Sequence, residues 1–280
     1  MEYDPIKFRL ARLIGGRLVL RRMFHLTLDL LFLRAWFIRR ELKRLKNRLP
    51  ERDLCILDAG MGFGQFSDRM LRLFPQAWLI GLEVDRSYFY GGERYFQILH
   101  PRARLILGDV QNLPLPANCV DLITCVDVME HIPDDRAAFT EYARILRPGG
   151  YFLMHTPRVQ DDQEMIEGGT FDPDSCQVGE HVRNGYRDQE ARERLETAGL
   201  VIDQIIHGYG APGRLAWRLL QGVPMALLSR GRGGVPLAAL WLIPALPWAI
   251  ILMGLDVATS SHKRGGSLLI TARKPFPGEL

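Results

Sequence analysis

The chain has 280 residues, of which 47% are hydrophobic and 24% are charged, so it can bury a full hydrophobic core. This composition excludes an intrinsically disordered chain and a small disulfide-stapled one. The net charge of +4 is unevenly distributed, because residues 1–50 contain 13 Lys and Arg against 4 Asp and Glu, or +9, and the rest carry −5. A nucleic-acid-binding protein usually has its basic residues on one face of the core, whereas here they lie in the N-terminal region. We therefore expect no nucleic-acid partner.

The cysteines and the N-terminal region indicate the compartment. Cys55, Cys119, Cys125 and Cys176 have no spacing typical of a zinc site or a disulfide framework, so we expect no metal and a reducing cytosol. The apolar residues near the N-terminus are interleaved with arginines instead of forming one block, which is not the order of a signal peptide. The N-terminal region should therefore remain in the mature protein.

Residues 5–49 alternate arginines with large apolar side chains. The apolar residues at helical spacing are Phe24, Leu28, Leu31, Phe32, Ala35 and Ile38. The pattern predicts two or three amphipathic helices, broken near Gly15 and Gly16 and ended by Pro50. Two interpretations stay open. The first is a helical cap packed on the core, and the second is a basic helix lying on an anionic membrane surface.

A glycine-rich turn follows the first predicted strand. A short apolar run at 55–57 reaches Asp58, and glycines at positions 60, 62 and 64 then open into a helical pattern. Glycine is needed where the backbone has positive φ or where a ligand approaches it closely. The order G-x-G-x-G differs from the dinucleotide fingerprint G-x-G-x-x-G. An acid before the first glycine would repel a pyrophosphate, but it suits a ligand with an ammonium group.

A second strand is predicted over residues 78–83 and ends in Glu83, 23 residues after Gly60. An acid near this spacing meets ribose hydroxyls in nucleotide-binding βαβ units. Asp85 is the neighbouring candidate. An acid after a strand can also be a helix N-cap, a role that suits Asp85 better than Glu83.

The chain continues as an alternation of strands and helices. Strands are predicted at 104–110, 120–126 and 150–155, and helices at 88–99, 136–146 and 187–197. This alternation predicts a parallel sheet with helices on both faces. The Arg-Pro-Gly-Gly run at 147–150 is a typical helix stop before a strand.

The glycine turn, Asp109, the Glu130-His131-Ile132 run and the Leu-Arg-Pro-Gly-Gly motif at 146–150 stand in an order and spacing that resembles the class I S-adenosylmethionine-dependent methyltransferases, with a type 11-like domain over about residues 52–157. The resemblance implies a Rossmann-like α/β fold with a seven-stranded sheet, S-adenosylmethionine as cofactor and S-adenosylhomocysteine as product. It implies cofactor contacts at Asp58, Ala59, Gly60 and Gly62 for the methionine end, at Glu83, Val84 and Asp85 for the ribose, at Gly108, Asp109 and Val110 for the adenine, and at Asp127 and His131 in the reaction cleft.

An acidic loop over residues 158–185 follows the fifth strand, at the carboxyl edge of the sheet. Its end carries His181, Arg183 and Tyr186, which either touch substrate or hold an ordered surface loop together. A methyl acceptor that is a hydroxyl or an acidic carbon needs a general base. His181 is the first candidate for that base, with His131 and His155 as rivals.

The last two strands, at 200–207 and 267–273, are separated by an insertion over 208–266, where the family usually has a short turn. Residues 235–255 contain no charge and are long enough to span a bilayer. A single crossing is excluded, because both flanking strands belong to one sheet. We expect Pro236, Pro244 and Pro247 to cut the apolar run, which leaves a hairpin dipping into one leaflet or a soluble lid.

The sequence therefore predicts a basic helical extension at 1–50 and a methyltransferase domain at 51–280 that contains the apolar insertion. The expected reaction is methyl transfer to a hydrophobic acceptor, such as a lipid, a quinone or an isoprenoid-like molecule, at the membrane face. One-sided attachment through 211–256 and the basic helices would place the protein in the cytoplasm, peripheral on the inner face of the cell membrane. The alternatives are a methyltransferase for a soluble aromatic or natural-product acceptor, with the insertion as a lid or dimer interface, and a non-catalytic S-adenosylmethionine-binding protein.

Overall fold

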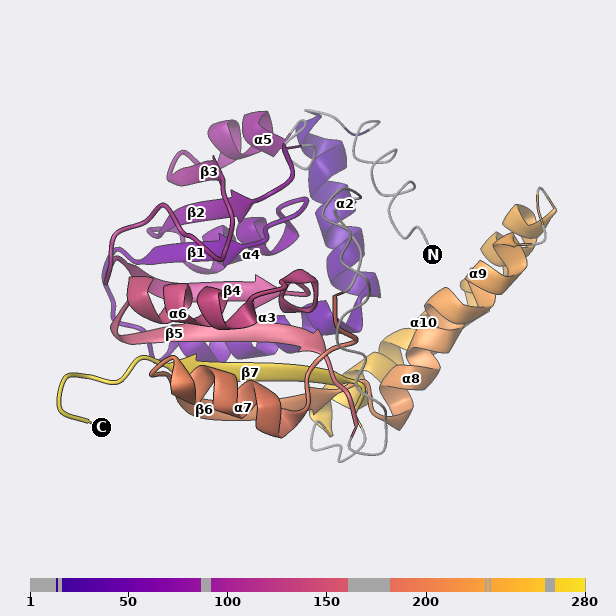
Figure 1. Cartoon of the computed structure of the whole chain (residues 1–280). Helices are drawn as coiled ribbons and strands as arrows, with labels where there is room; N and C mark the ends of the chain where they lie inside the picture. Colours follow the sequence, from indigo (N-terminus) through magenta and orange to yellow (C-terminus); the bar gives the residue numbers. More distant parts are fainter. Residues whose placement is uncertain are drawn as a thin grey trace.

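A seven-stranded sheet with helices on both faces forms the centre of the computed structural model, which describes residues 14, 17–86, 92–160, 182–229, 231, 233–259 and 265–279 (Figure 1). The strands are β1 (Cys55–Ala59), β2 (Trp78–Glu83), β3 (Ala103–Leu107), β4 (Val120–Val126), β5 (Leu146–Pro157), β6 (Val201–Gly208) and β7 (Ser267–Arg273). Their order is β3-β2-β1-β4-β5-β7-β6, and only β7 runs antiparallel to its neighbours. The predicted fold class is confirmed.

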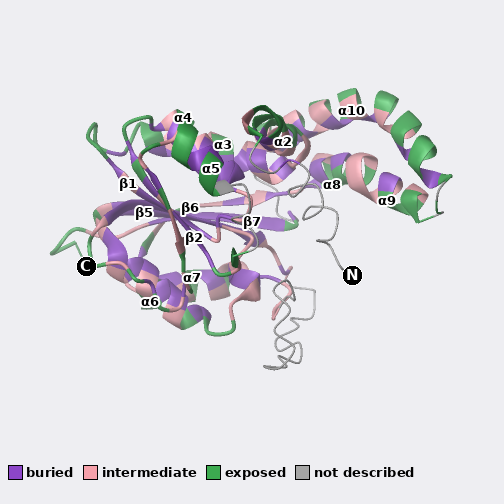
Figure 2. Cartoon of the chain, turned by 90° about the horizontal axis from the view of Figure 1, so that it is seen from above, coloured by how far each residue is buried: buried purple, intermediate pink, exposed green. Residues whose placement is uncertain are grey.

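Eleven helical segments are defined within the described residues. They are α2 (Leu18–Leu31), α3 (Leu33–Lys46), α4 (Gln65–Leu73), α5 (Gly92–Leu99), η2 (Met129–His131), α6 (Asp135–Ile145), α7 (Asp188–Thr197), α8 (Ala211–Trp217), η4 (Arg218–Gly222), α9 (Val223–Leu228) and α10 (Gly234–Ala258). Figure 2 shows α6 and α7 on one face of the sheet, with α3 and α4 on the other. The five strands that are joined by parallel pairing, β1 to β5, therefore have helices to bury their apolar side chains, as a parallel sheet requires.

The N-terminal helix α3 is part of the main core. Phe37, Ile38, Leu42 and Leu45 are almost fully buried and belong to one hydrophobic cluster with residues of the sheet and of α4. The opposite face of α3 exposes Arg39, Lys43 and Lys46 to solvent, as on an amphipathic helix. This packing is that of a helical cap, and a domain boundary at residue 50 stays a prediction.

The insertion between β6 and β7 is a hairpin of two antiparallel helical arms that projects from the body (Figure 1). One arm runs through α8, η4 and α9, and α10 returns along it. The indole N–H of Trp241 donates to the carbonyl of Leu219 at 3.0 Å and joins the arms midway. At the base, the buried Asp256 accepts hydrogen bonds from the N–H groups of Tyr209 and Gly213, both at 2.9 Å.

The expected interruption of the apolar run by prolines is wrong, because α10 is continuous over 25 residues. Pro236 lies in the first helical turn, where the missing N–H would have no partner. Pro244 and Pro247 lie inside the helix at exposed positions. On the other side of α10, Ala245 and Ala249 are buried, and packing against the first arm offsets the two lost N–H donors.

Candidate functional site

The turn after β1 requires all three of its glycines. Gly60, Gly62 and Gly64 have φ values of 72°, 51° and 78°, a region that disfavours residues with a Cβ. A Cβ at Gly60 would lie 2.3 Å from the side chain of Val128, and one at Gly64 would lie 2.5 Å from Phe96. A Cβ at Gly62 would meet nothing within 4 Å. The turn is therefore packed at both ends and has open space at its middle glycine.

Asp58 lies beneath this turn with both carboxylate oxygens engaged. The hydroxyl of Ser67 donates to Oδ2 at 2.5 Å, and the hydroxyl of Thr124 donates to Oδ1 at 3.0 Å. Burial raises the pKa of Asp58 to about 6. Asp58 thus ties β1, α4 and β4 together, as does the packing of the buried Ala59. The expected contact of Asp58 with an ammonium group stays a prediction.

Glu83 connects the end of β2 to the glycine turn. Its carboxylate accepts hydrogen bonds from the N–H groups of Gly62 at 2.9 Å, Val84 at 2.9 Å and Asp85 at 3.2 Å. Burial raises the pKa of Glu83. Glu83, which the sequence analysis identified from its spacing to Gly60, is therefore in direct contact with the turn.

The predicted adenine residues follow β3, the neighbour of β2. The N–H of Gly108 donates to the carbonyl of Glu83 at 3.1 Å, which joins the two strand ends. Asp109 is exposed, and its carboxylate accepts the N–H of Gln111 at 2.9 Å. Val110 is buried. Strand β3 ends before Asp109 because this residue turns back through a bridge to Asn112, so the strand is shorter than predicted.

A triad of charged and polar side chains lies at the ends of β4 and β5. Asp127 has a positive φ of 53° and accepts from His155 Nδ1 at 2.5 Å and from Arg34 Nη1 at 2.7 Å. Burial opposes ionisation, but the charges of Arg34 and His155 hold the pKa of Asp127 below its usual range. The Asp–His pair is set by β4 and β5, two strands that the sequence predicted and that the structure places side by side. Arg34 comes from α3 and was not identified from the sequence.

His155 is the candidate base whose surroundings are best defined. Only 4% of the residue is exposed, and its Nε2 atom is buried without a hydrogen-bond partner among the described residues. Because Asp127 takes Nδ1, a neutral imidazole presents the Nε2 lone pair. His131 is partly exposed in η2. His181 lies outside the described residues.

Glu130 connects the triad to the segment that follows residue 181. Burial, with a contribution from the charge of Asp127, raises the pKa of Glu130 to about 8. Its carboxyl accepts from Thr156 Oγ1 at 3.2 Å, and its backbone carbonyl accepts from the N–H of Val182 at 3.0 Å.

Arg183 and Tyr186 hold this segment to the rest of the protein. Both side chains bind the buried carboxylate of Asp135, and the distance from the Tyr186 hydroxyl is 2.9 Å. Their partners lie within the chain, which fits an ordered loop better than substrate contact.

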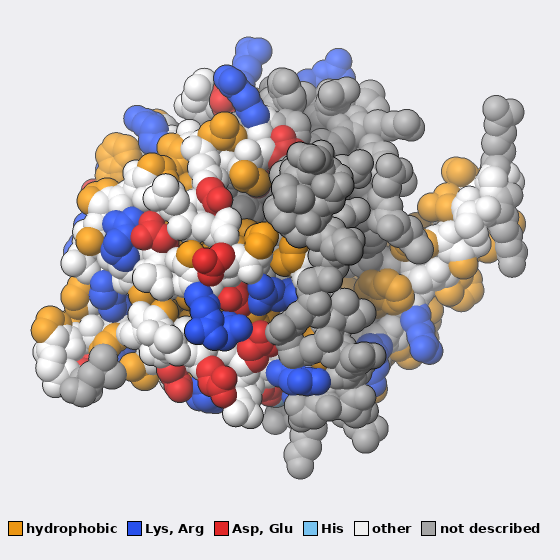
Figure 3. All heavy atoms as spheres, viewed as in Figure 1, with side chains coloured by type: hydrophobic (Ala, Val, Ile, Leu, Met, Phe, Trp, Pro, Cys, Tyr) orange, Lys and Arg blue, Asp and Glu red, His pale blue; other side chains and the backbone are white. Residues whose placement is uncertain are grey.

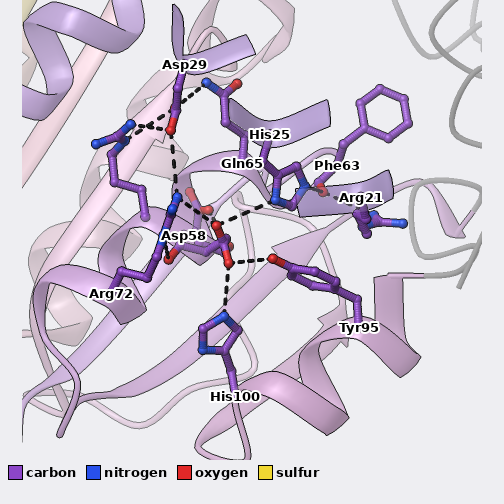
Figure 4. A network of polar contacts seen from close by, with 12 residues as sticks. Arg21, His25, Asp29, Asp58, Phe63, Gln65, Arg72, Tyr95 and His100 are labelled. Carbon is purple, nitrogen blue, oxygen red and sulfur yellow. Dashed lines mark hydrogen bonds and ion pairs between the residues drawn. The ribbon is translucent and has the colours of Figure 1, made fainter. Parts of the chain in front are cut away.

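Helix α2 covers the glycine turn from outside (Figure 4). Arg21 Nη2 and His25 Nε2 both donate to the carbonyl of Phe63, at 3.1 and 3.0 Å, and both residues are buried. Behind them Asp68 accepts from the hydroxyl of Tyr95 at 2.7 Å and lies 3.7 Å from His25 Nδ1. The spacing of four residues puts Arg21 and His25 on one helix face. That spacing is the sequence signal for this contact.

Comparison with known families identifies part of the chain. Residues 57–154 match the model of a methyltransferase domain. A protein of Mycolicibacterium smegmatis named "Probable S-adenosylmethionine-dependent methyltransferase" is 33% identical over 183 residues, which are 62% of this chain and 64% of that protein. A fatty-acid O-methyltransferase of the same organism is 28% identical over 176 residues, 59% of this chain and 62% of the relative. The chain thus spans slightly less than two thirds of the length of these relatives.

Solved structures share the fold. A geranyl diphosphate C-methyltransferase from Streptomyces coelicolor A3(2), in complex with Mg²⁺, geranyl diphosphate and S-adenosylhomocysteine, superposes with a TM-score of 0.52. The match covers 84% of this chain and 78% of that one at 16% sequence identity. At this identity the likeness shows the fold alone.

Proposed function

We propose that the protein transfers a methyl group from S-adenosylmethionine to a hydrophobic acceptor at a membrane face. The proposal starts from the class I S-adenosylmethionine-dependent methyltransferase domain that residues 57–154 form. One observation carries this proposal. The glycine turn, Glu83 and the Asp127–His155 pair lie together at the carboxyl ends of neighbouring strands, which is where open α/β sheets bind ligands.

The residues present fit the cofactor. The backbone has open space at Gly62, and carboxylates stand at the ends of β2 and β3 for ribose hydroxyls and an adenine amino group. Asp58, Ala59, Gly60 and Gly62 would hold the methionine end. When bound, S-adenosylmethionine supplies a methyl group on a positively charged sulfur, which makes that methyl electrophilic. The task of the chain is to align the acceptor and to exclude water.

His155 is the proposed general base for an acceptor that must lose a proton. Asp127 holds Nδ1, which fixes the ring orientation and leaves Nε2 to take the proton. Arg34 keeps Asp127 ionised and so stabilises the imidazolium that forms. His131 and His181 remain rivals.

The position of the apolar hairpin supports the proposal that the acceptor is hydrophobic. Its base packs against the start of α3, where a Cβ on Gly213 would lie 2.6 Å from the side chain of Leu33. The next residue, Arg34, binds Asp127 at the site. The names of the similar proteins, a fatty-acid O-methyltransferase and a geranyl diphosphate C-methyltransferase, are compatible with an apolar acceptor.

The cytoplasmic side of the cell membrane is the proposed location. Figure 3 shows hydrophobic side chains along the projecting hairpin, and exposed fractions of 72% for Ile243 and 65% for Trp248 indicate a surface that is costly to leave in water. A soluble acceptor, with the hairpin as a lid or dimer interface, is the second candidate, since an exposed apolar surface also suits a protein interface.

Two measurements test the proposal. Calorimetric titration should give one-to-one binding of both S-adenosylmethionine and S-adenosylhomocysteine, and the absence of binding by either would remove the cofactor assignment. In vesicle flotation, wild type should float with anionic vesicles and stay partly bound at high salt. A variant with residues 211–256 replaced by a short glycine-serine turn should be released by salt, because only the basic helices then attract it.

A further inference from the structure

Two helices outside the candidate site carry exposed apolar stripes. On α10 the stripe consists of Leu237, Leu240, Ile243, Trp248, Ile251 and Leu255, and on α2 it consists of Val19, Met23, Leu26 and Leu30. Within each stripe the spacing is close to the helical repeat, so each set occupies one side of its helix. Neither stripe is covered by another described part of the chain.

The two stripes meet at Trp36. Its indole N–H donates to the carbonyl of Leu30, the last residue of the α2 stripe, at 3.1 Å. The same indole is the nearest group to Gly254, where a Cβ would lie 3.9 Å away, and the next residue, Leu255, ends the α10 stripe. Both helices lie on the side of the sheet that carries α3 and α4 (Figure 2). We call the two stripes, with Trp36 between them, the two-arm surface.

We propose that the two-arm surface binds the interface of an anionic lipid bilayer, with α10 lying along the membrane plane instead of entering tip first. The inference rests on the proposed function and names the face through which the enzyme meets its membrane. Trp36, where the two stripes meet, is two residues from Arg34 on α3, and Arg34 binds Asp127. Helix α3 therefore carries one residue of the surface and one residue of the site within a single turn.

The lengths of the two arms argue against tip-first entry. Arg218 is exposed on the first arm, eleven residues before Ser229 at its outer end. Entry would stop when Arg218 reached the headgroups, after about 16 Å of helix, roughly one leaflet of the ~30 Å hydrocarbon core. Trp248, Ile251 and Leu255 would then remain in water. An in-plane helix places the whole α10 stripe, about 27 Å long, in the acyl boundary.

Charge favours an anionic bilayer over a second copy of this chain. Residues 235–255 contain no charged side chain, so this stretch of α10 has no charge to desolvate. Exposed cations flank the α2 arm on α2 and α3, namely Arg17, Arg22, Arg39, Lys43 and Lys46. Near an anionic surface each adds about fivefold to partition at low salt. In a dimer through the same surface these cations would lie on both partners, and like charges would repel.

Four exposed positions give the test. Leu240→Glu lies in the outer half of α10, Leu255→Glu at its base and Met23→Glu on α2, and Val201→Glu at the start of β6 is the matched control. Binding is measured by flotation of the full chain with vesicles of phosphatidylcholine and 30% phosphatidylglycerol. We expect the first three variants to lower partition about ten- to a hundredfold, because an apolar contact is lost and a charge must be desolvated. The control should bind like wild type.

Each other result overturns the proposal. Weakening by Leu240→Glu alone means tip-first entry, and weakening by the two α10 variants without Met23→Glu removes α2 from the surface. Light scattering tests for a dimer. If wild type does not bind vesicles but forms a dimer that Leu240→Glu dissociates, the surface binds a second copy of this chain instead. The same four positions are also changed to Gln, which separates loss of apolar contact from the effect of the introduced charge. Thermal unfolding shows whether a variant is misfolded. Titration of the same samples with S-adenosylmethionine reports cofactor binding independently, so the two proposals can fail separately.

Discussion

Glu83 holds the glycine turn through hydrogen bonds from Gly62, Val84 and Asp85. Glu83→Gln keeps the size of the side chain and removes its charge. Loss of a charge-assisted hydrogen bond costs about 1.5 to 3 kcal/mol, so binding of S-adenosylmethionine should weaken roughly ten- to a hundredfold. Calorimetry measures this, with Asp53→Asn as the control, because Asp53 pairs with Arg102 before β1, at the opposite end of the strand from the turn. Equal affinity in all three proteins would contradict the cofactor assignment.

The role of His155 as general base can be tested with a second histidine as the control. In His155→Gln we expect turnover to fall by about 10² to 10⁴, because the proton acceptor is lost, while the affinity for S-adenosylmethionine stays the same. The matched control is His207→Gln, since His207 Nε2 also lies close to an aspartate, 2.8 Å from Asp188 Oδ2, away from the site. Kinetics of methyl transfer measures both variants. Full activity of His155→Gln would move the role to His131, His181 or no residue.

Glu130 should make stability depend on pH. Its pKa rises from an ordinary 4.5 to about 8 in the folded protein, so the folded state favours the protonated form. This contribution is complete below pH 4.5 and is lost as the pH rises through 8.

Glutamine cannot ionise, so Glu130→Gln isolates this contribution. Relative to the variant, the unfolding free energy of wild type should fall by on the order of 2 to 4 kcal/mol between acidic and mildly alkaline pH. Urea titrations at several pH values measure it. Parallel pH curves for the two proteins would show that Glu130 is ionised in the folded state.

The site residues that the sequence predicted share one property. Glu83 ends β2 and Asp127 directly follows β4, and the apolar runs of both strands are clear in the sequence. The topology of a parallel sheet therefore brings the two acids to one edge. Arg34, Arg21 and His25 could not be found in this way. They reach the site from helices whose docking depends on tertiary packing. The four-residue spacing of Arg21 and His25 puts both on one helix face, but it does not specify which distant loop that face will meet.

At the scale of elements, α2 acts as a clamp on the glycine turn. Arg21→Met removes one of the two donors to the Phe63 carbonyl, and a lost buried hydrogen bond of about 1 to 3 kcal/mol should weaken cofactor binding by about tenfold. Arg22→Met makes the same change at the next, exposed position and should behave like wild type. Calorimetry and hydrogen exchange of the turn amides measure the effect. If both variants match wild type, α2 does not order the turn.

The strands were easier to predict than the helices. The apolar runs of β2, β4 and β7 are bounded by turn residues, and their predicted limits are confirmed. The error was in α10, where proline propensity predicted a break. Tertiary packing of the two hairpin arms outweighs that propensity, because the Trp241 hydrogen bond to Leu219 and the buried alanines hold the helix along its length.

At the scale of the whole molecule, the N-terminal helices and the hairpin gather at one end of the sheet. Helix α3 contacts both, since Leu33 packs on the hairpin base and Arg34 binds Asp127. The apolar surface and the candidate site are therefore joined by one helix. The proposed methyl transfer to a membrane acceptor depends on this connection.

Transfer of labelled methyl from S-adenosylmethionine tests the central claim most directly. The purified protein is incubated with the labelled cofactor and with vesicles made from the lipids of the cells that produce it, and the organic and aqueous phases are then counted. We expect label in the organic phase only when vesicles are present, and much less with the variant that lacks residues 211–256. Label confined to a water-soluble product, or equal transfer by that variant, would contradict methyl transfer to a membrane acceptor.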